Sequence, residues 1–325
     1  MAEQPARRAL HGIHHVTAIA GDPQENLDFY VGLLGLRLVK KTVNQDDPGT
    51  YHLFYGDALG HPGTELTFFP WPGGSPGIEG VGQAVTVGFA VPETSLGYWA
   101  QRLRANGIAA SAPFHRFAEE AIALTDPHGL NLELVAGATT GRRHLWSPWE
   151  GGPVPPEVAI RGVHAVAVRE TGVDPTGEFL TEALGFRPAG EGDGRLRFEA
   201  GEGGSGAILD LLPRPGERHG RVAVGTVHHV AWRTPDAAEQ ERWQASIAAR
   251  GGSISPVIDR FWFRSIYFRE PGGVLFEIAT DGPGFTVDER AEELGDRLIL
   301  PPWLEAERPR IEAALPSLQL SEPVR

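Results

Sequence analysis

The sequence predicts an α+β fold assembled from four copies of one unit, each made of a strand, a helix and about three further strands. Four segments open with alternating or continuous apolar and β-branched residues, as strands do. These segments are residues 12–19, 83–90, 162–168 and 227–232. Each is followed by a helical pattern and later by a short apolar strand. A unit that recurs with a length of roughly 55–65 residues indicates an internal repeat.

The helices follow directly after the opening strands. In the first unit, Leu27, Tyr30, Val31 and Leu34 recur at the i, i+3, i+4, i+7 spacing of one helix face. The same kind of pattern occurs at residues 96–103, 179–184 and 243–247. A glycine closes each predicted helix, at Gly35, Gly107, Gly185 and Gly251.

Each unit ends in a short apolar strand, at residues 65–69, 130–135, 207–212 and 274–279. Two of these strands follow evident turns at 126–129 and 270–273. A stretch rich in glycine, proline and serine then separates the second unit from the third. We therefore expect two paired-module domains and a helical tail. The predicted boundaries are residues 1–145 for units one and two, 146–285 for units three and four, and 286–325 for the tail.

Composition excludes several classes of protein. The chain has no cysteine, which rules out disulfides, thiol nucleophiles, zinc fingers and iron–sulfur clusters. Its net charge of −13 makes nucleic acid an improbable partner, and no apolar run is long enough to span a membrane. We expect a cytoplasmic protein, with a homo-oligomer left open.

The differences between the units indicate a metal site. Unit one carries the doublet His14-His15 and unit four carries His228-His229 at the same place in the opening strand. Unit four also places Glu277 between large apolar residues in its last strand, where an unpaired carboxylate is costly to bury. Two imidazoles and one carboxylate suit Fe(II) or Mn(II), with Zn(II) as a further option.

The remaining histidines and carboxylates are assigned other roles. Glu133 and Asp210 occupy the place of Glu277 in units two and three, but unit two has no histidine doublet. His164 has no doublet partner, and we expect it to be structural. Surface or turn positions are expected for His52, His61, His115, His128, His144 and His219.

These residues carry a family likeness. The fourfold unit resembles the vicinal oxygen chelate superfamily, which includes glyoxalase, bleomycin-resistance proteins and extradiol dioxygenases. Several segments look like its ring-cleaving hydroquinone dioxygenase branch: residues 12–17, 40–46, 51–57, 225–231, 259–269 and 300–305.

The resemblance implies that His15, His229 and Glu277 bind Fe(II), with Mn(II) as the alternative. It also implies roles around the metal for His14, Thr17, His228, Arg260 and Tyr267. Where the more familiar catechol enzymes carry a ligand in unit three, this chain has Ala165, and unit one supplies His15 instead. The site must then join the first and last units, so the two halves of the chain must pack together.

The turn between Tyr267 and Glu277 offers a local test of this site. If residues 271–273 form a three-residue hairpin loop with a glycine in the left-handed region, Glu270 pairs with Val274. Tyr267 then lies directly opposite Glu277, on the same face. A loop that is one residue shorter or longer would turn Tyr267 away.

The expected function is Fe(II)-dependent cleavage of a hydroquinone or related dihydroxylated aromatic with O₂, as in aromatic hydrocarbon catabolism. The alternatives are an extradiol catechol dioxygenase, a glyoxalase-type isomerase or lyase, and a metal-independent protein of bleomycin-resistance type. The isomerase would need a carboxylate in the last strand of unit one. The sequence places Phe68 or Phe69 there, with Glu65 slightly out of register.

Overall fold

The structure is a computed structural model that describes residues 9–137 and 146–320. Module one contains β1 (Ile13–Ala20), α1 (Pro23–Leu27) continued by the π-helical turn η1 (Asp28–Leu33), β2 (Arg37–Asn44), β3 (Asp47–Gly56) and β4 (Glu65–Pro70). Module two contains β5 (Gln83–Val91), α2 (Leu96–Ala105), β6 (Phe114–Arg116), β7 (Glu119–Thr125) and β8 (Asn131–Ala136).

The third and fourth modules repeat this order. Module three contains β9 (Val163–Glu170), α3 (Asp174–Glu182), β10 (Arg187–Gly192), β11 (Arg195–Glu199) and β12 (Ile208–Pro213). Module four contains β13 (Val227–Thr234), α4 (Ala237–Ala249), β14 (Ile258–Asp259), β15 (Arg264–Arg269) and β16 (Leu275–Thr280). The four-module α+β fold predicted from the repeats is confirmed.

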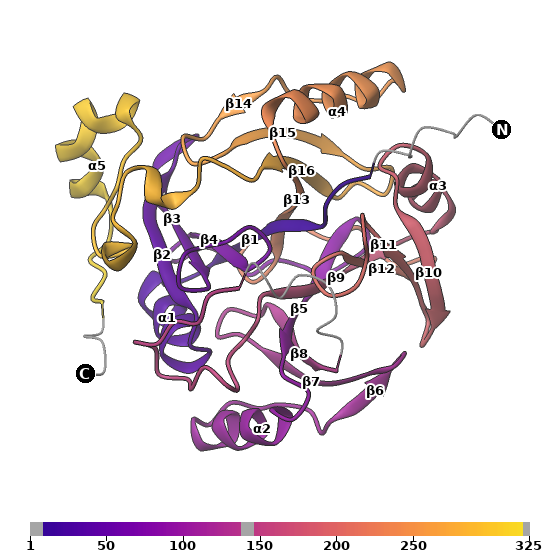
Figure 1. Ribbon diagram of the computed structural model, residues 1–325, viewed down its shortest axis with the longest axis horizontal. Helices are drawn as coiled ribbons and strands as arrows, with labels where there is room; N and C mark the ends of the chain where they lie inside the picture. Colours follow the sequence, from indigo (N-terminus) through magenta and orange to yellow (C-terminus); the bar gives the residue numbers. More distant parts are fainter. Residues whose placement is uncertain (1–8, 138–145, 321–325) are drawn as a thin grey trace.

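The strands form two eight-stranded sheets, and each sheet takes its strands from two modules. One sheet has the order β14-β15-β16-β13-β1-β4-β3-β2 and joins module four to module one. The other has the order β10-β11-β12-β9-β5-β8-β7-β6 and joins module three to module two. Figure 1 shows the orange strands of module four beside the indigo β1, with α2, α3 and α4 at the periphery.

This pairing differs from a simple division of the chain into halves. The predicted boundary at 145 groups together modules that share no sheet, and each sheet crosses that boundary. The boundary at residue 145 therefore remains a prediction. The two sheets pair module one with module four and module two with module three. The expected packing of the two halves follows from this arrangement.

Helix α4 illustrates how the modules acquire their cores. Asp236 caps its first turn by accepting a hydrogen bond from the backbone N–H of Glu239. Its inner face buries Gln240, Trp243 and Ile247, and the Gln240 amide donates to the carbonyl of Ile278 on β16 at 2.8 Å. Complete burial of a large apolar side chain such as Ile247 stabilises a fold by roughly 1.5–3 kcal/mol.

The tail beyond residue 285 follows as short helical turns, η3 (Phe285–Val287), η4 (Ala291–Glu293) and η5 (Pro302–Glu307), and α5 (Arg308–Ala314). It lies against module one at the yellow edge of Figure 1. Lys40, fully buried on β2, donates to the carboxylates of Asp288 at 2.8 Å and of Glu289. Asp288 also accepts from the indole N–H of Trp262 at 3.0 Å, so the tail is tied to module four as well.

Across residues 9–137 and 146–320, no helix has both the length and the apolar composition needed to cross a bilayer.

Candidate metal centre and pocket

The central strands β1 and β13 bring the two histidine doublets together. They pair antiparallel, with Thr17 opposite His229 and His15 opposite Ala231. Because neighbouring residues of a strand point to opposite faces, one member of each doublet can face the other across this pair. The structure brings His15 and His229 together, the pair of histidines that the family resemblance implies.

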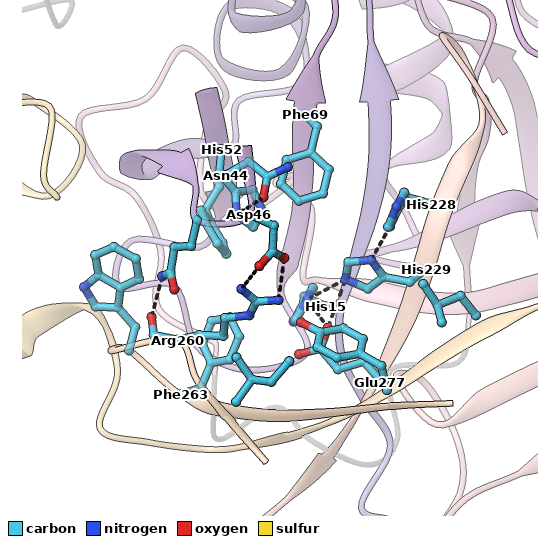
Figure 2. A pocket seen from close by; sticks show the side chains of 16 residues that line it. His15, Asn44, Asp46, His52, Phe69, His228, His229, Arg260, Phe263 and Glu277 are labelled. Atoms are coloured by element: carbon cyan, nitrogen blue, oxygen red, sulfur yellow. Dashed lines mark hydrogen bonds and ion pairs between the residues drawn. The ribbon is translucent and has the colours of Figure 1, made fainter. Parts of the chain in front are cut away.

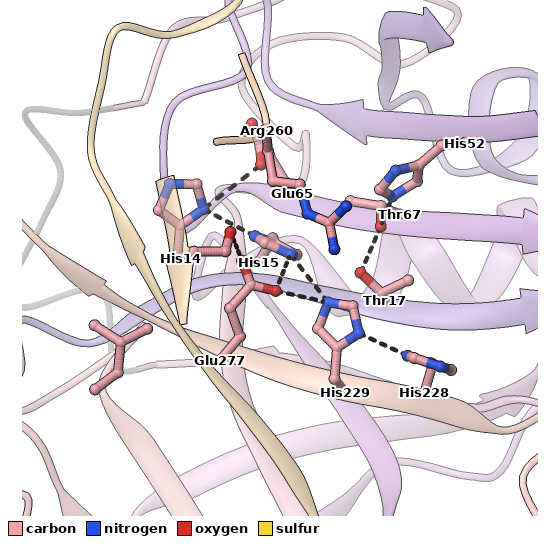
Figure 3. Close-up of polar contacts among 12 residues, drawn as sticks. His14, His15, Thr17, His52, Glu65, Thr67, His228, His229, Arg260 and Glu277 are labelled. Atoms are coloured by element: carbon pink, nitrogen blue, oxygen red, sulfur yellow. Dashed lines mark hydrogen bonds and ion pairs between the residues drawn. The ribbon is translucent and has the colours of Figure 1, made fainter. Parts of the chain in front are cut away.

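His15, His229 and Glu277 form a compact buried cluster. The Nε2 atoms of the two histidines are 3.3 Å apart, and Glu277 Oε2 lies 3.5 Å from His15 Nε2 and 3.0 Å from His229 Nε2. All three side chains are buried, and their ligand atoms lie within 4.8 Å of one another. Figure 3 shows the three side chains converging from β1, β13 and β16.

A chain of hydrogen bonds fixes the tautomer of His15. The backbone carbonyl of Thr280 can only accept, so His14 must donate to it through Nε2–H, at 3.1 Å. Burial lowers the pKa of His14 well below its ordinary value, so the ring is neutral and its Nδ1 is an acceptor. His15 must then donate from Nδ1, 2.9 Å away. In a neutral His15 ring, the Nε2 lone pair therefore points toward Glu277.

The second doublet is arranged in the same way. His229 Nδ1 lies 2.8 Å from His228 Nδ1, and burial lowers the pKa of His228 to about 3. His15 and His229 are thus each held by a hydrogen bond to the preceding histidine. A ligand histidine that is held through its second nitrogen is the usual arrangement at metal sites.

Glu277 is held as a carboxylate. Burial raises its pKa, but the charges and hydrogen bonds of His15 and His229 outweigh burial and keep the pKa well below its usual range. Oε1 accepts from the hydroxyl of Ser265 at 2.5 Å, whereas Oε2 has no hydrogen-bond partner although it is buried. Ser265 was not singled out from the sequence.

A second group of possible ligands is formed by His14, His15 and Glu65. Its two histidine Nδ1 atoms already share one hydrogen bond at 2.9 Å, so neither atom is directed at a shared ion. Burial raises the pKa of Glu65 well above its ordinary value, and the nearby carboxylates of Asp57 and Glu277 raise it further. Glu65 is therefore expected to be a neutral carboxyl beside the cluster of His15, His229 and Glu277, and not a metal ligand.

The other modules show what replaces Glu277 at the same position. Glu277 pairs with Ala231, two residues after the ligand histidine, and the matching partner of Thr17 on β4 is Thr67. The expectation of Phe68 or Phe69 at this place was wrong by one or two residues. In the other sheet, Glu133 and Asp210 stand there.

Those two carboxylates are neutralised by arginine. Arg116 pairs with both oxygens of Glu133, and Arg197 pairs with both oxygens of Asp210 at 2.8 and 3.0 Å. His164 lies 3.0 Å from Glu119, as expected of a structural histidine. The second sheet thus pairs these carboxylates with arginine, whereas Glu277 in the first sheet faces two histidines.

The hairpin that carries Tyr267 and Glu277 has the predicted register. The N–H of Glu270 donates to the carbonyl of Val274 at 3.1 Å, and Gly273 adopts a φ of +106°. Tyr267 consequently pairs with Glu277 across β15 and β16, and the two share a face. The three-residue loop is confirmed.

The cluster opens into a cavity of about 350 Å³ between modules one and four (Figure 2). Aromatic and aliphatic side chains make up part of the wall, among them Phe54, Phe69, Trp262, Phe263 and Leu275. Polar groups converge from the remaining sides: the cluster of His15, His229 and Glu277, and Asn44, Gln45, Asp46, His52, His228, Arg260 and Tyr267.

Arg260 lies at this cavity, and both terminal nitrogens of its guanidinium are hydrogen-bonded. Its guanidinium pairs with the two carboxylate oxygens of Asp46 at 3.2 and 2.9 Å, and its Cζ lies 5.5 Å from the centre of the Tyr267 ring. Gln45 donates to the backbone carbonyl of Arg260 at 3.0 Å. The β2–β3 turn of module one thereby holds a cationic side chain that belongs to module four.

The structure separates the predicted residues into two groups. His228, Arg260 and Tyr267 line the cavity together with the three ligand candidates, whereas His14 and Thr17 lie behind it. The expectation that His52 is a surface or turn residue was wrong, because it lies on β3 and faces the cavity. Its alternation with Phe54 along the strand was the signal available in the sequence. His144 lies outside the described residues.

Comparison with known proteins agrees with this architecture. The family model described as "Glyoxalase/Bleomycin resistance protein/Dioxygenase superfamily" matches residues 12–134 and 162–278. The Bacillus subtilis (strain 168) protein named "Putative ring-cleaving dioxygenase MhqO" is 44% identical, over 96% of this chain and 97% of its own length. A "Chlorohydroquinone/hydroquinone 1,2-dioxygenase" of Sphingobium indicum is 35% identical, over 94% and 95%. A crystal structure of a "putative dioxygenase" from Bacillus subtilis superposes with a TM-score of 0.91 at 43% identity, covering 97% of this chain and 100% of that one.

Proposed function

Since this chain belongs to the glyoxalase, bleomycin resistance protein and dioxygenase superfamily, and within it to the ring-cleaving dioxygenases, we propose that it cleaves a hydroquinone or related dihydroxylated aromatic with Fe(II) and O₂. The observation that carries the proposal is the convergence of His15 Nε2, His229 Nε2 and Glu277 Oε2, three buried ligand atoms that lie within 4.8 Å of one another.

The donor set fits a divalent metal. His15, His229 and Glu277 would hold it through two Nε2 atoms and one carboxylate oxygen, the two-histidine, one-carboxylate set of non-haem Fe(II) oxygenases. Mn(II) is compatible with the same ligands. When bound, the metal would supply the redox chemistry with O₂ and lower the pKa of a hydroxyl that it coordinates.

The cavity suits a small aromatic ring. A volume of about 350 Å³ lies at the small end of ligand pockets, and its wall combines aromatic faces with a few converging polar groups. Phe263 lies against His15, with ring centres 5.4 Å apart, so apolar surface reaches the edge of the cluster. A flat ring bound here would be shielded from water on its faces.

The remaining polar residues would control charge and protons. His228, neutral and at the cavity, can accept or return a substrate proton. Burial raises the pKa of Tyr267, so its phenol stays protonated and acts as a hydrogen-bond donor. Arg260, held at the cavity by Asp46, would favour a developing oxyanion through its fixed positive charge. His14 and Thr17 would act from behind the cavity by fixing their neighbours.

The structure disfavours an isomerase of the glyoxalase type. Such an enzyme would need a second carboxylate in module one, and Thr67 stands at the position that corresponds to Glu277. A metal-independent binding protein would have no use for three buried ligand atoms that converge. A catechol dioxygenase shares the same metal chemistry, and the choice of substrate decides between the two. We place the protein in the cytoplasm, as its cysteine-free sequence suggests.

Metal content and O₂ uptake test the proposal together. Protein purified without oxygen should contain about one iron per chain and consume one O₂ for each hydroquinone ring cleaved. His15→Ala, His229→Ala and Glu277→Ala should each lose the metal and the activity while the fold persists. His164→Ala, which alters the corresponding strand of the other sheet, is the control and should keep its iron. Catechol turnover with inert hydroquinone would refute the substrate assignment, and a metal-free active protein would refute the whole proposal.

A further inference from the structure

We propose that His52 is a substrate-binding residue that presents an Nδ1–H donor to a ring oxygen held apart from the metal centre, in a tautomer fixed by Thr67 and Thr17. The inference rests on the proposed function in taking a para-dihydroxylated ring as the ligand. It assigns the module-one wall of the cavity a role in choosing between hydroquinone and catechol.

The position of His52 is well defined. The side chain projects from β3 into the cavity, and its ring lies between Phe54, with centroids 3.9 Å apart, and Phe69, at 4.4 Å. Figures 2 and 3 both show it separated from the cluster of His15, His229 and Glu277. Two aromatic neighbours and one hydrogen bond leave the imidazole little rotational freedom.

The direction of the hydrogen bonds follows from counting donors. Thr17 Oγ1 lies 2.7 Å from Thr67 Oγ1, which lies 2.9 Å from His52 Nε2. Thr17 is fully buried, and among the described residues Thr67 is the only side-chain partner of its hydroxyl. A buried hydroxyl hydrogen needs an acceptor, so Thr17 donates to Thr67. Thr67 then donates to His52 Nε2.

This order determines the state of His52. A ring that accepts at Nε2 carries its proton on Nδ1 when it is neutral. Burial, with smaller effects of His15 and His229, lowers the pKa of His52 well below its ordinary value, which agrees with a neutral ring. Nδ1 has no hydrogen-bond partner in the part of the chain that the structure describes, and it is not among the buried unpartnered atoms. The cavity therefore receives a fixed N–H donor.

The position of this N–H donor suits a ligand with two oxygens on opposite sides of its ring. Both hydroxyls of a catechol are adjacent, so a metal that holds one can also hold the other. A hydroquinone carries its second oxygen on the opposite side of the ring, where a metal that holds the first oxygen cannot reach it. A donor on the far wall of the cavity suits that second oxygen. His52 would then favour substrates with an oxygen acceptor at the para position.

The tautomer can be measured without any substrate. Nitrogen-15 NMR of the full-length protein, labelled at histidine and prepared without iron, should show His52 protonated at Nδ1. Thr67→Val removes the hydroxyl that donates to Nε2 and should shift the ring to a mixture of tautomers. Thr42→Val is the matched control, because Thr42 lies opposite His52 in the β2–β3 ladder and its buried hydroxyl has no hydrogen-bond partner. An Nε2-protonated ring in the wild type would overturn the inference.

Binding under anaerobic conditions tests the role in recognition. The iron-loaded wild type should bind 4-methoxyphenol about tenfold more tightly than 4-ethylphenol, which replaces the para oxygen with a methylene. His52→Leu should abolish this preference and His52→Gln should retain part of it. A preference that survives in His52→Leu would refute the inference even if hydroquinone is cleaved. Inert hydroquinone would refute the proposed function, while both measurements on His52 still decide the inference.

Discussion

Replacement of Tyr267 by phenylalanine removes one hydroxyl from the wall of the cavity and leaves the ring. Tyr267 lies opposite Glu277 in the hairpin, and its ring centre is 5.9 Å from that of His229 and 5.5 Å from the Arg260 Cζ. These ring contacts survive the change, so the free energy of unfolding should fall by no more than about 1 kcal/mol. A positioned donor that acts in the reaction contributes roughly 10²–10³ in rate, or about 3–4 kcal/mol of activation free energy.

The assay is turnover at saturating hydroquinone with full iron occupancy, together with metal content and thermal unfolding of the same preparation. We expect near-normal iron, a near-normal melting temperature and a large loss of kcat. Tyr55→Phe is the control, because Tyr55 is buried away from the cavity and its hydroxyl has no hydrogen-bond partner. If Tyr267→Phe turns over at the wild-type rate, the hydroxyl takes no part in the reaction and the role assigned to it should be abandoned.

Three further substitutions test other parts of the structure. Ser265→Ala removes the donor to Glu277 and should weaken metal affinity by about 10–100-fold in a chelator competition, and an unchanged affinity would contradict the support assigned to this hydroxyl. Lys40→Met leaves the buried carboxylate of Glu289 without its partner and should lower the free energy of unfolding by about 3–5 kcal/mol in denaturant titrations; a loss below about 1 kcal/mol would show that the pair contributes little. Burial raises the pKa of Glu170 to about 8, so its folded-state protonation stabilises the protein at low pH and this contribution is lost as pH rises from about 4.5 to 8. Glu170→Gln should flatten the pH dependence of unfolding in that window, and an unaltered slope would contradict the raised pKa.

The repeats made the fold and much of the candidate ligand cluster predictable from sequence. A histidine doublet that occurs twice at one repeat position indicates that one histidine of each doublet faces the other, and the family resemblance then singles out His15 and His229. The hairpin loop before Val274 then placed Tyr267, because a loop of known length fixes a register locally. Features determined within one hairpin or one repeat unit could be derived without the structure.

Features determined by distant contacts could not. His52 looks like an ordinary polar strand residue, and only the packing of module four against module one encloses it in a cavity. The position of Thr67 depends on the parallel pairing of β4 with β1, and no short turn joins these strands to fix their register. The sheet partners were hidden for the same reason, since the opening strands of all four modules carry similar apolar patterns.

The pairing of module one with module four also constrains the order in which the chain can acquire its structure. β1 emerges first during synthesis, but its antiparallel neighbour β13 follows much later, and His15 and His229 are 214 residues apart. The inner sheet is complete once residue 213 has been made, whereas β1 must wait with one edge unpaired. Contacts between such distant segments form slowly. The ligand cluster is therefore among the last parts of the molecule to assemble, because a chain halted before Glu277 contains every strand of the inner sheet but an incomplete set of ligands.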